Sequence, residues 1–280
     1  MAGWYPSHMP KARRELRDNL RLVDVVIEVV DARIPESSRI PNLDSMLGSK
    51  SLLVALNKSD LADPHTTSDW VRHYKLANIT AVPVDAVKGV GVKPLIDAAH
   101  AQANRVSAGR RRLRPMRAMM VGIPNVGKSS LLNRILGRRS AKTGERPGIT
   151  RGKQWIALRR DFELLDLPGI MWPEQQHSEG FMRLCITGAI PDDVVDKIEV
   201  ASALIHILLD KNPDCLRSRY GIAEPSSSAQ SMLEAVALRR GFLGAGGVPD
   251  LTKAALAVLQ DFRSARLGRL SLERPPLHSK

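Results

Sequence analysis

One glycine-rich motif restricts the possible folds of this chain more than any other feature. Residues 122–129 read Gly-Ile-Pro-Asn-Val-Gly-Lys-Ser, between a run typical of a buried strand (117–121) and a stretch with helical periodicity (128–136). A strand, a glycine turn and a helix start form a phosphate cradle together, because backbone N–H groups and the helix N-terminus point at the anion. The alternative is a surface glycine turn, which requires neither flanking element.

The polar side chains of this motif have distinct expected roles. We expect Lys128 to reach the β- and γ-phosphates of a bound nucleotide and the Ser129 hydroxyl to ligate Mg²⁺. The predicted phosphate-binding residues are Asn125, Val126, Gly127, Lys128, Ser129 and Ser130. The motif therefore predicts a site for a nucleoside triphosphate and its metal ion.

Two short motifs follow at the spacing expected for the rest of such a site. Asp166-Leu-Pro-Gly169 ends a predicted strand; we expect Asp166 to hold Mg²⁺ through water and the Gly169 N–H to bond the γ-phosphate. Thr150 precedes them in a loop with Pro147 and Gly148. Such a loop can order when its threonine ligates Mg²⁺, so Thr150 is a predicted metal ligand and catalytic residue. An ordinary Pro-Gly turn is the alternative for that loop.

A base-reading motif, Asn57-Lys58-Ser59-Asp60, follows another predicted strand (51–56). A carboxylate such as Asp60 can accept hydrogen bonds from guanine N1–H and the 2-amino group, two donors that adenine lacks. Asn57 is expected to steady the loop, and the Lys58 stem can lie along the ring. One strand later, Asp85-Ala86 is expected to offer the Ala86 N–H to guanine O6. Together these motifs predict GTP and GDP rather than ATP.

The order of the motifs predicts an unusual connection of the sheet. In most guanine-nucleotide domains the base-reading motif follows the phosphate-binding ones, whereas here residues 57–60 precede residues 122–129. Apolar runs at 22–30, 51–56, 79–84 and 117–121 alternate with helical stretches, which is typical of a parallel sheet. We therefore predict an α/β fold: a circularly permuted, mostly parallel P-loop GTPase sheet in residues 1–174. Residues 175–280 show helical periodicity and are predicted to form an all-helical domain.

The charge of the chain indicates a polyanionic partner. The formal net charge is +13 and the pI is about 10.2, which favours nucleic acid, with an anionic membrane surface second. The low aromatic content (4%) disfavours base stacking as the main reading device. Three basic stretches compete as RNA contacts, Lys11–Arg21, Arg105–Arg117 and Arg263–Arg274. The spacing of Arg263, Arg266 and Arg269 predicts one face of a last helix. A merely solvated face is the alternative for each stretch.

Cellular location is predicted from cysteine usage and hydropathy. Cys185 and Cys215 form neither a disulfide framework nor a metal pattern and are interpreted as buried residues in a reducing compartment. No apolar run approaches the roughly 20 residues that span a bilayer, and no secretory signal is evident. We expect a cytoplasmic protein without a membrane partner, although an organelle stroma stays open for a mature protein.

With these motifs in place, the chain resembles the circularly permuted GTPases of the ribosome biogenesis GTPase A family over nearly its whole length. The resemblance rests on the motif order, on the opening Trp4–Glu15, on Val30–Pro35, and on two C-terminal segments, Asp261–Leu270 and Leu272–Pro275. It implies a GTPase that binds the large ribosomal subunit late in assembly, with rRNA as the direct contact. Ser7 and Asp85 depart from the family, which often has Gly and Ser at these positions.

The catalytic machinery is the least complete part of the pattern. Ile170 follows Gly169, where small GTPases place a glutamine that orients water, so unassisted turnover is expected to be slow, on the order of 10⁻⁴ s⁻¹. The resemblance suggests His8 as the missing group once the ribosome orders the N-terminal arm; a solvated histidine is the alternative. Asn125 is expected to help hold K⁺, as in similar GTPases, unless it only stabilises the turn.

Three readings of the function stay open at this level. The first is a GTP-hydrolysing assembly factor for the large ribosomal subunit or its precursor, acting as a monomer. The second is an RNA-binding module in which the nucleotide is regulatory and catalysis has little role. The third is a GTPase serving tRNA modification or a membrane process, which the absence of a lipid-anchor motif disfavours.

Overall fold

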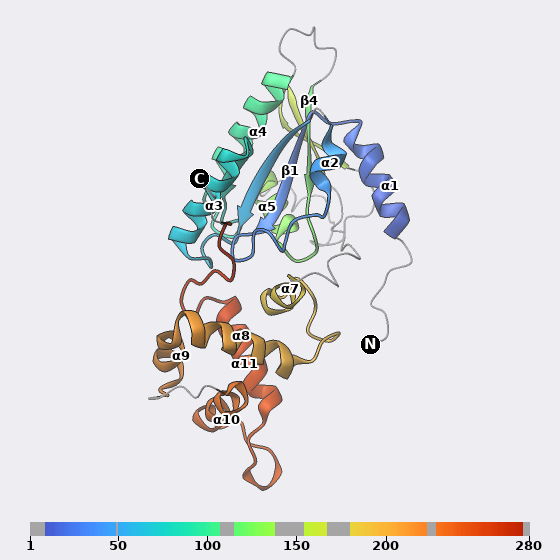
Figure 1. The fold of residues 1–280 in the computed structure, drawn as a ribbon. Helices are drawn as coiled ribbons and strands as arrows, with labels where there is room; N and C mark the ends of the chain where they lie inside the picture. Colours follow the sequence, from blue (N-terminus) through green and yellow to red (C-terminus); the bar gives the residue numbers. More distant parts are fainter. Residues whose placement is uncertain are drawn as a thin grey trace.

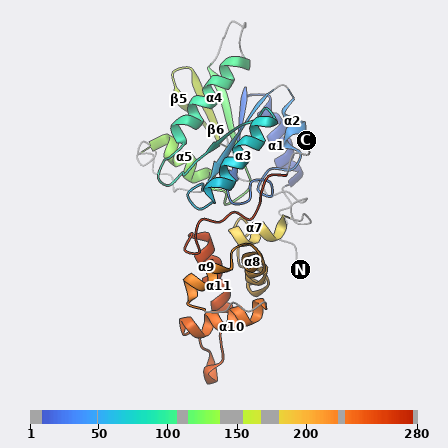
Figure 2. The ribbon, with the colours of Figure 1, turned by 60° about the vertical axis from the view of Figure 1, so that its left-hand side comes forward.

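The computed structural model describes residues 9–48, 50–106, 115–137, 154–166, 180–222 and 228–276. It consists of a six-stranded sheet with helices on both faces, followed by a helical region (Figures 1 and 2). The strands are β1 (Val25–Asp31), β2 (Ser51–Asn57), β3 (Thr80–Pro83), β4 (Met116–Val121), β5 (Gln154–Arg159) and β6 (Phe162–Asp166). The helices around the sheet are α1 (Met9–Leu20), α2 (Leu43–Leu47), α3 (Pro64–Leu76), α4 (Val92–Val106) and α5 (Lys128–Leu136).

The sheet has the order β3-β2-β1-β4-β6-β5, and among these strands every neighbouring pair is parallel except β5 with β6. All seven residues of β1 are buried, as expected for a central parallel strand that helices cover on both faces. Helices α3 and α4 lie on one face and α1 and α2 on the other (Figure 1). The predicted α/β fold with a mostly parallel sheet is thus confirmed. Because β1 pairs with both β2 and β4, the motifs that follow these strands lie at the same edge of the sheet.

The parallel register decides which residues meet at that edge. Asp31 at the end of β1 lies beside Asn57 at the end of β2, and Met120 of β4 lies beside Asp166 of β6. The carboxyl ends of parallel strands share one edge of a sheet, which is where ligands bind in open α/β folds. Figure 1 shows this edge facing the helical region.

The helical region contains five α-helices among its described residues: α7 (Phe181–Thr187), α8 (Lys197–Lys211), α9 (Pro213–Tyr220), α10 (Ala229–Arg240) and α11 (Leu251–Arg263). Its core is apolar and well buried, and both cysteines lie within it, as predicted. The predicted boundary between residues 174 and 175 falls outside the described residues. No helix in the part of the chain that the structure describes is long and apolar enough to cross a membrane.

The prediction that Arg263, Arg266 and Arg269 share one face of a helix is wrong. Helix α11 ends at Arg263, and Ala265 has a φ of +56°, a backbone conformation that no helix continues through. The three side chains consequently go to different places. Arg263 pairs with Asp192, and Arg266 pairs with Asp261. Arg269 donates to the backbone carbonyls of Ser59, in the base-reading motif, and of Ala62 just after it.

Candidate nucleotide site

The phosphate loop adopts the backbone that its glycines permit. Gly122 follows β4 with a φ of +155°, and a Cβ there would lie 2.5 Å from the Val29 carbonyl oxygen. Gly127 begins α5 with a φ of +92°, and a Cβ there would lie 2.3 Å from Asn57 Nδ2. Both positions therefore require glycine for conformation and for space. The loop approaches the base-reading motif so closely that no side chain fits between them.

The polar residues of this loop lie at the first turn of α5. Lys128 is buried, with its ammonium 3.5 Å from the Ile123 carbonyl oxygen of the same loop. Ser129 and Ser130 are exposed at the helix N-terminus. This end of the helix carries unpaired N–H groups and a partial positive charge, so it suits phosphate.

Asn57 joins three of the predicted motifs through one side chain. Its Nδ2 donates to the Val126 carbonyl oxygen of the phosphate loop at 2.8 Å, and its Oδ1 accepts the Ala86 N–H at 3.2 Å. The side chain is buried, 1% exposed, so these bonds are protected from water. The base-reading motif, the following segment and the phosphate loop therefore surround one site.

Lys58 makes a second connection between the motifs. Its backbone has a φ of +57°, which turns the chain sharply at the end of β2. Its Nζ lies 2.8 Å from the Asn125 carbonyl oxygen and 2.9 Å from Asp31 Oδ2. The lysine thus spans from the end of β1 to the phosphate loop.

Asp31 and Arg33 are site residues for which sequence reasoning assigned no role. The Arg33 guanidinium donates to both Asp31 oxygens, at 2.9 and 2.7 Å, and both side chains are buried. Burial opposes ionisation of Asp31, but the charges of Arg33 and Lys58 outweigh it and hold the pKa of the carboxyl well below its ordinary value. The Val30–Pro35 resemblance marked these residues, but nothing in their spacing indicated a partner at Lys58.

In the segment after β3, Asp85 stands where the family often has serine, and its carboxylate has a structural role. Asp85 Oδ1 accepts the N–H groups of Val87 and Lys88, each at 2.9 Å, which closes an Asx-type turn. Arg134 of α5 adds a contact that the sequence did not reveal, from its Nε to the Ala86 carbonyl oxygen at 3.2 Å. A cavity of about 470 Å³ lies between this segment and α5. Its lining residues are Ala86, Val87, Ser130, Asn133, Arg134 and Gly137.

Ser59 and Asp60 complete the base-reading motif. The Ser59 N–H donates to the Val84 carbonyl oxygen at 3.0 Å, which ties the loop to the end of β3. Asp60 is partly exposed, and within the described ranges no group donates a hydrogen bond to its carboxylate. That carboxylate is therefore available to the two donors of a guanine edge.

Several predicted site residues lie outside the described residues, namely His8, Thr150 and Gly169. Asp166 is described only in its main chain, at the last position of β6, where it pairs with Met120 just before the phosphate loop. Its predicted metal-binding role is compatible with that position, because β6 and the phosphate loop leave the same edge of the sheet.

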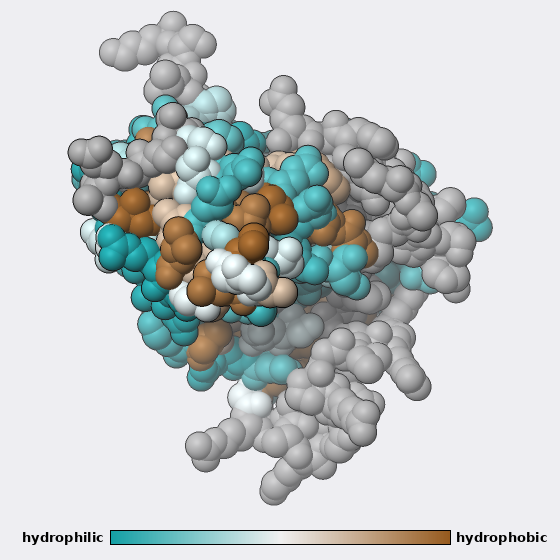
Figure 3. Space-filling model, turned by 90° about the horizontal axis from the view of Figure 1, so that it is seen from below, coloured by the Kyte–Doolittle hydropathy of each residue, from teal (hydrophilic) through white to brown (hydrophobic). Residues whose placement is uncertain are grey.

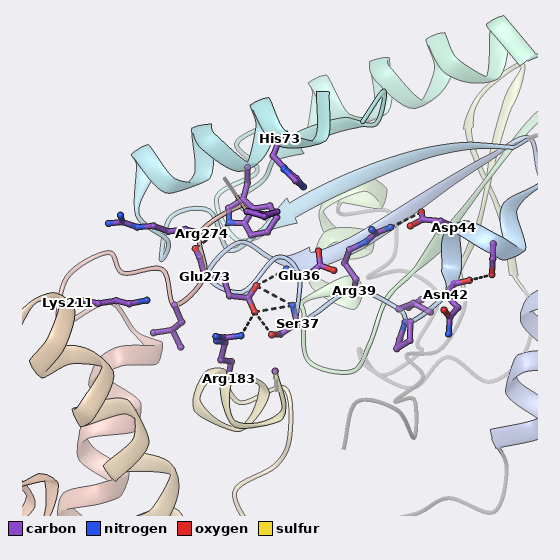
Figure 4. Close-up of a pocket in the computed structure, with 17 residues that line it drawn as sticks. Glu36, Ser37, Arg39, Asn42, Asp44, His73, Arg183, Lys211, Glu273 and Arg274 are labelled. Carbon is purple, nitrogen blue, oxygen red and sulfur yellow. Dashed lines mark hydrogen bonds and ion pairs between the residues drawn. The ribbon is translucent and has the colours of Figure 1, made fainter. Parts of the chain in front are cut away.

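A larger cavity, of about 1440 Å³, lies elsewhere (Figure 4). It is bounded by residues 36–45, by α3, by Arg183 of α7 and by the C-terminal segment. None of its 17 lining residues belongs to loops 57–60 or 122–130. The larger of these two cavities is therefore not the nucleotide site, which lies where the predicted motifs meet.

Comparison with known proteins agrees with this geometry. A family model described as "50S ribosome-binding GTPase" matches residues 117–226. Ribosome biogenesis GTPase A of Priestia megaterium is 40% identical over 277 residues, covering 97% of this chain and 96% of its own length. The chain belongs to the ribosome biogenesis GTPase A family. The Thermotoga maritima member is 33% identical over 98% of this chain, and mitochondrial ribosome-associated GTPase 1 of Bos taurus is 32% identical over all of it.

Solved structures support the same assignment. GNP-bound YlqF from T. maritima is 30% identical, covers 95% of this chain and 98% of its own, and superposes with a TM-score of 0.66. The GDP-bound structure of TM YlqF gives a TM-score of 0.68 at 28% identity. This member of the ribosome biogenesis GTPase A family is thus a GTPase that binds GTP and GDP, as predicted.

Proposed function

We propose that this GTPase is an assembly factor that binds the large ribosomal subunit or its precursor through rRNA, in a manner that depends on the bound nucleotide. The observation that carries the proposal is the pair of hydrogen bonds made by the Asn57 side chain, to Val126, 69 residues away, and to Ala86, 29 residues away. These bonds bring the three motifs together around one guanine-nucleotide site. The names of the relatives supply the ribosome as the partner class.

Within the site, Asp60 is proposed to read guanine and Ala86 to contact the base edge. The cofactor-binding set follows the predicted one: Asn57, Lys58, Ser59, Asp60, Asp85, Ala86, Asn125, Val126, Gly127, Lys128, Ser129, Ser130 and Gly169. In this structure the Ala86 N–H donates to Asn57, so contact with guanine O6 requires that bond to be shared or exchanged. The short Asn57–Val126 bond keeps the base and phosphate ends at a fixed separation.

Mg²⁺ is proposed to bind beside the phosphates through Ser129, Thr150 and Asp166. The donor set fits, because hydroxyl and carboxylate oxygens are the ligands Mg²⁺ prefers, with nucleotide phosphates and water completing its shell. In the described part of the chain no three His, Cys, Asp or Glu residues cluster as a metal site. The ion supplies charge neutralisation at the β- and γ-phosphates when the nucleotide is bound.

Catalysis is proposed to depend on the partner. Lys128, Thr150 and His8 remain the proposed catalytic residues, with His8 brought to the site by the ribosome. Asn125 donates from Nδ2 to the Ala189 carbonyl oxygen at 3.2 Å, which leaves its Oδ1 as the atom to hold K⁺. Unchanged ribosome-stimulated turnover in His8→Ala would remove His8 from this set, and equal rates in K⁺ and Na⁺ would remove the cation.

The RNA surface is proposed to lie on the first of the three basic stretches, Lys11–Arg21, rather than on the other two. Arg117 pairs with Glu163 and lies 4.2 Å from the Trp155 ring centroid, and Arg263 pairs with Asp192, so both act inside the fold. On α1, by contrast, Arg14 and Arg17 are exposed, as is Arg21 just after the helix, while Leu16 and Leu20 are buried. This amphipathic helix is our candidate for phosphate contacts, which supply affinity without reading sequence.

The helical region is proposed as the second contact with the subunit. We keep the proposed division at residues 174 and 175, with the monomer as the functional unit. Seen from the end that the helical region occupies, hydrophobic and hydrophilic side chains are interspersed (Figure 3). Leu238, Leu243 and Val248 are exposed on α10 and the turn that follows it. Such a mixed surface suits a ribonucleoprotein better than bare RNA.

The testing experiment is sedimentation of the protein with large-subunit precursors in a sucrose gradient, with a non-hydrolysable GTP analogue or with GDP. We expect co-sedimentation with the analogue, weaker association with GDP, and loss of binding as salt is raised. A Lys128→Ala variant is the control for nucleotide dependence. Equal binding of both nucleotide forms would contradict the proposal, and binding without any stimulated hydrolysis would favour a regulated RNA-binding module.

A further inference from the structure

The chain returns from the helical region to the nucleotide domain after α11. Gly268 has a φ of +98° with no atom within 4 Å of its Cβ position, so glycine is needed there for the turn itself. Leu267 before it is buried and anchors the turn to the helical region. Beyond Gly268 the segment 269–273, which we call the C-terminal strap, runs along the base-reading loop (59–63).

The strap makes four hydrogen bonds to this loop. Arg269 donates from NH2 to the Ser59 carbonyl oxygen at 2.8 Å and from Nε to the Ala62 carbonyl oxygen at 2.9 Å. The Leu270 N–H donates to the Leu61 carbonyl oxygen at 3.3 Å. The Asp63 N–H donates to Ser271 Oγ at 3.1 Å. Asp60 lies in the middle of the loop that these bonds hold.

The far end of the strap is fixed to the segment after β1. The Leu272 N–H donates to the Arg33 carbonyl oxygen at 2.9 Å. The buried Glu273 carboxylate accepts the N–H groups of Glu36 and Ser37 at 2.8 and 3.1 Å, and Figure 4 shows it at the side of the large cavity. The strap is therefore held at both ends, which keeps the Arg269 backbone beside the base-reading loop.

The competing view is that Arg269 is an ordinary surface arginine or an RNA contact, as its charge alone suggests. Its two donors are directed to two carbonyl oxygens of one loop, and the planar guanidinium presents both donors in one fixed geometry. Arg266, three residues earlier, is a fair comparison: both arginines are exposed, but Arg266 pairs with Asp261 within the helical region. The two arginines carry the same charge and are close in sequence, but only Arg269 bonds to the base-reading loop.

We infer that Arg269 is a positioning residue for guanine recognition, which fixes the backbone on both sides of Asp60 and makes base specificity depend on the helical region. The inference rests on the proposed role of Asp60 as the guanine-reading carboxylate. Two hydrogen bonds to one base edge require the carboxylate to be held within a few tenths of an ångström. If the base-reading loop is already fixed before the nucleotide binds, less conformational entropy is lost on binding, and the affinity is higher.

The strap also couples the nucleotide site to any partner that binds the helical region. A ligand that displaces the helical region displaces the strap, which loosens Asp60 and weakens nucleotide binding. Coupling of this kind is reciprocal, so nucleotide binding also favours the strapped arrangement of the helical region. A partner of the helical region can thus assist nucleotide release without touching the nucleotide.

The test compares GDP with inosine diphosphate, which lacks the 2-amino group and so loses one of the two bonds to Asp60. Binding of both is measured by calorimetry on the full chain in wild type, Arg269→Ala, Arg269→Lys and Arg266→Ala. We expect Arg269→Ala to reduce the preference for GDP over inosine diphosphate by about tenfold, the equivalent of one charge-assisted hydrogen bond. Arg269→Lys, which keeps the charge but lacks the rigid fork of donors, should recover part of that preference, and Arg266→Ala should keep all of it.

Two outcomes overturn the inference. One is an unchanged preference in Arg269→Ala; the other is an equal weakening of both nucleotides, which indicates a general loss of structure rather than a displaced Asp60. Melting curves with bound nucleotide identify any unfolded fraction, and Ser271→Ala, which removes a different strap bond to the loop, provides a second variant. If wild type itself shows no preference for GDP over inosine diphosphate, the role of Asp60 fails, and that outcome is distinguishable from failure of the strap alone.

Discussion

The ammonium of Lys58 lies 2.9 Å from the carboxylate of Asp31, at the ends of two adjacent parallel strands. The same ammonium donates to the Asn125 carbonyl oxygen, and the same carboxylate binds Arg33. Arg33 in turn donates to the Thr187 carbonyl oxygen at the end of α7. One buried carboxylate thus connects the base-reading motif, the phosphate loop and the helical region.

Replacing Asp31 with asparagine is expected to lower the free energy of unfolding by about 3–5 kcal/mol, because Arg33 and Lys58 then lose their counter-charge in a buried place. Urea denaturation at neutral pH measures this. Asp44→Asn is the matched control: its carboxylate also pairs with an arginine, but it is 58% exposed, so a change below about 1 kcal/mol is expected. A similar small change in Asp31→Asn would show that the buried network carries little stability.

The pH dependence of stability should carry the signature of Asp31. Its pKa is lowered in the folded state, so the unfolded chain takes up a proton first as pH falls below the ordinary value of 3.8. The stabilisation from this carboxylate is therefore complete above pH 3.8 and lost progressively below it, by up to about 1.4 kcal/mol per pH unit. Denaturation of wild type and Asp31→Asn between pH 5 and 2.5 should show the difference between them shrinking with acid. A difference that stays constant would contradict the assignment.

Features that depend on residues close together in the chain could be predicted from the sequence, whereas contacts between distant residues could not. The phosphate loop was predictable because glycines, lysine and serine act within eight residues, and α5 begins at Lys128 as its periodicity indicates. The pairing of Asp31 with Lys58 was not, because it depends on the register of β1 against β2, which no spacing reveals. The same holds for Arg134, which reaches Ala86 across 48 residues.

Arg269 shows the opposite failure, in which a local rule was applied beyond its range. A spacing of three residues places side chains on one face only while the helix continues, and α11 ends before Arg266. Asp85 shows a third case: the departure from serine suggested a weakened element, yet its carboxylate closes the turn with two backbone N–H groups. An aspartate is compatible with such a turn, but the sequence alone does not show that its carboxylate accepts these two N–H groups.

The two cysteines should be unreactive in the folded protein. Burial raises the pKa of the Cys185 thiol to about 12 and that of Cys215 to about 11, so almost no thiolate is present at neutral pH. With a chromogenic disulfide reagent at pH 8, we expect very slow reaction of the native chain and rapid reaction of both thiols in denaturant. Rapid labelling of either thiol in the native chain would show that the helical region opens around it.

Gly127→Ala should break the contact between the base-reading motif and the phosphate loop. Its added Cβ would lie 2.3 Å from Asn57 Nδ2, so Asn57 must move and its bond to the Val126 carbonyl oxygen is lost. We expect GDP affinity to fall at least tenfold, about 1.4 kcal/mol, in titrations with a fluorescent GDP analogue. Gly241→Ala is the matched control, since Gly241 also has a positive φ, +67°, but faces open space in the helical region. It should cost about 1 kcal/mol of stability and leave GDP affinity unchanged. If both variants bind GDP as tightly as wild type, Asn57 does not hold the two loops together, and the close approach of Gly127 has no role in binding.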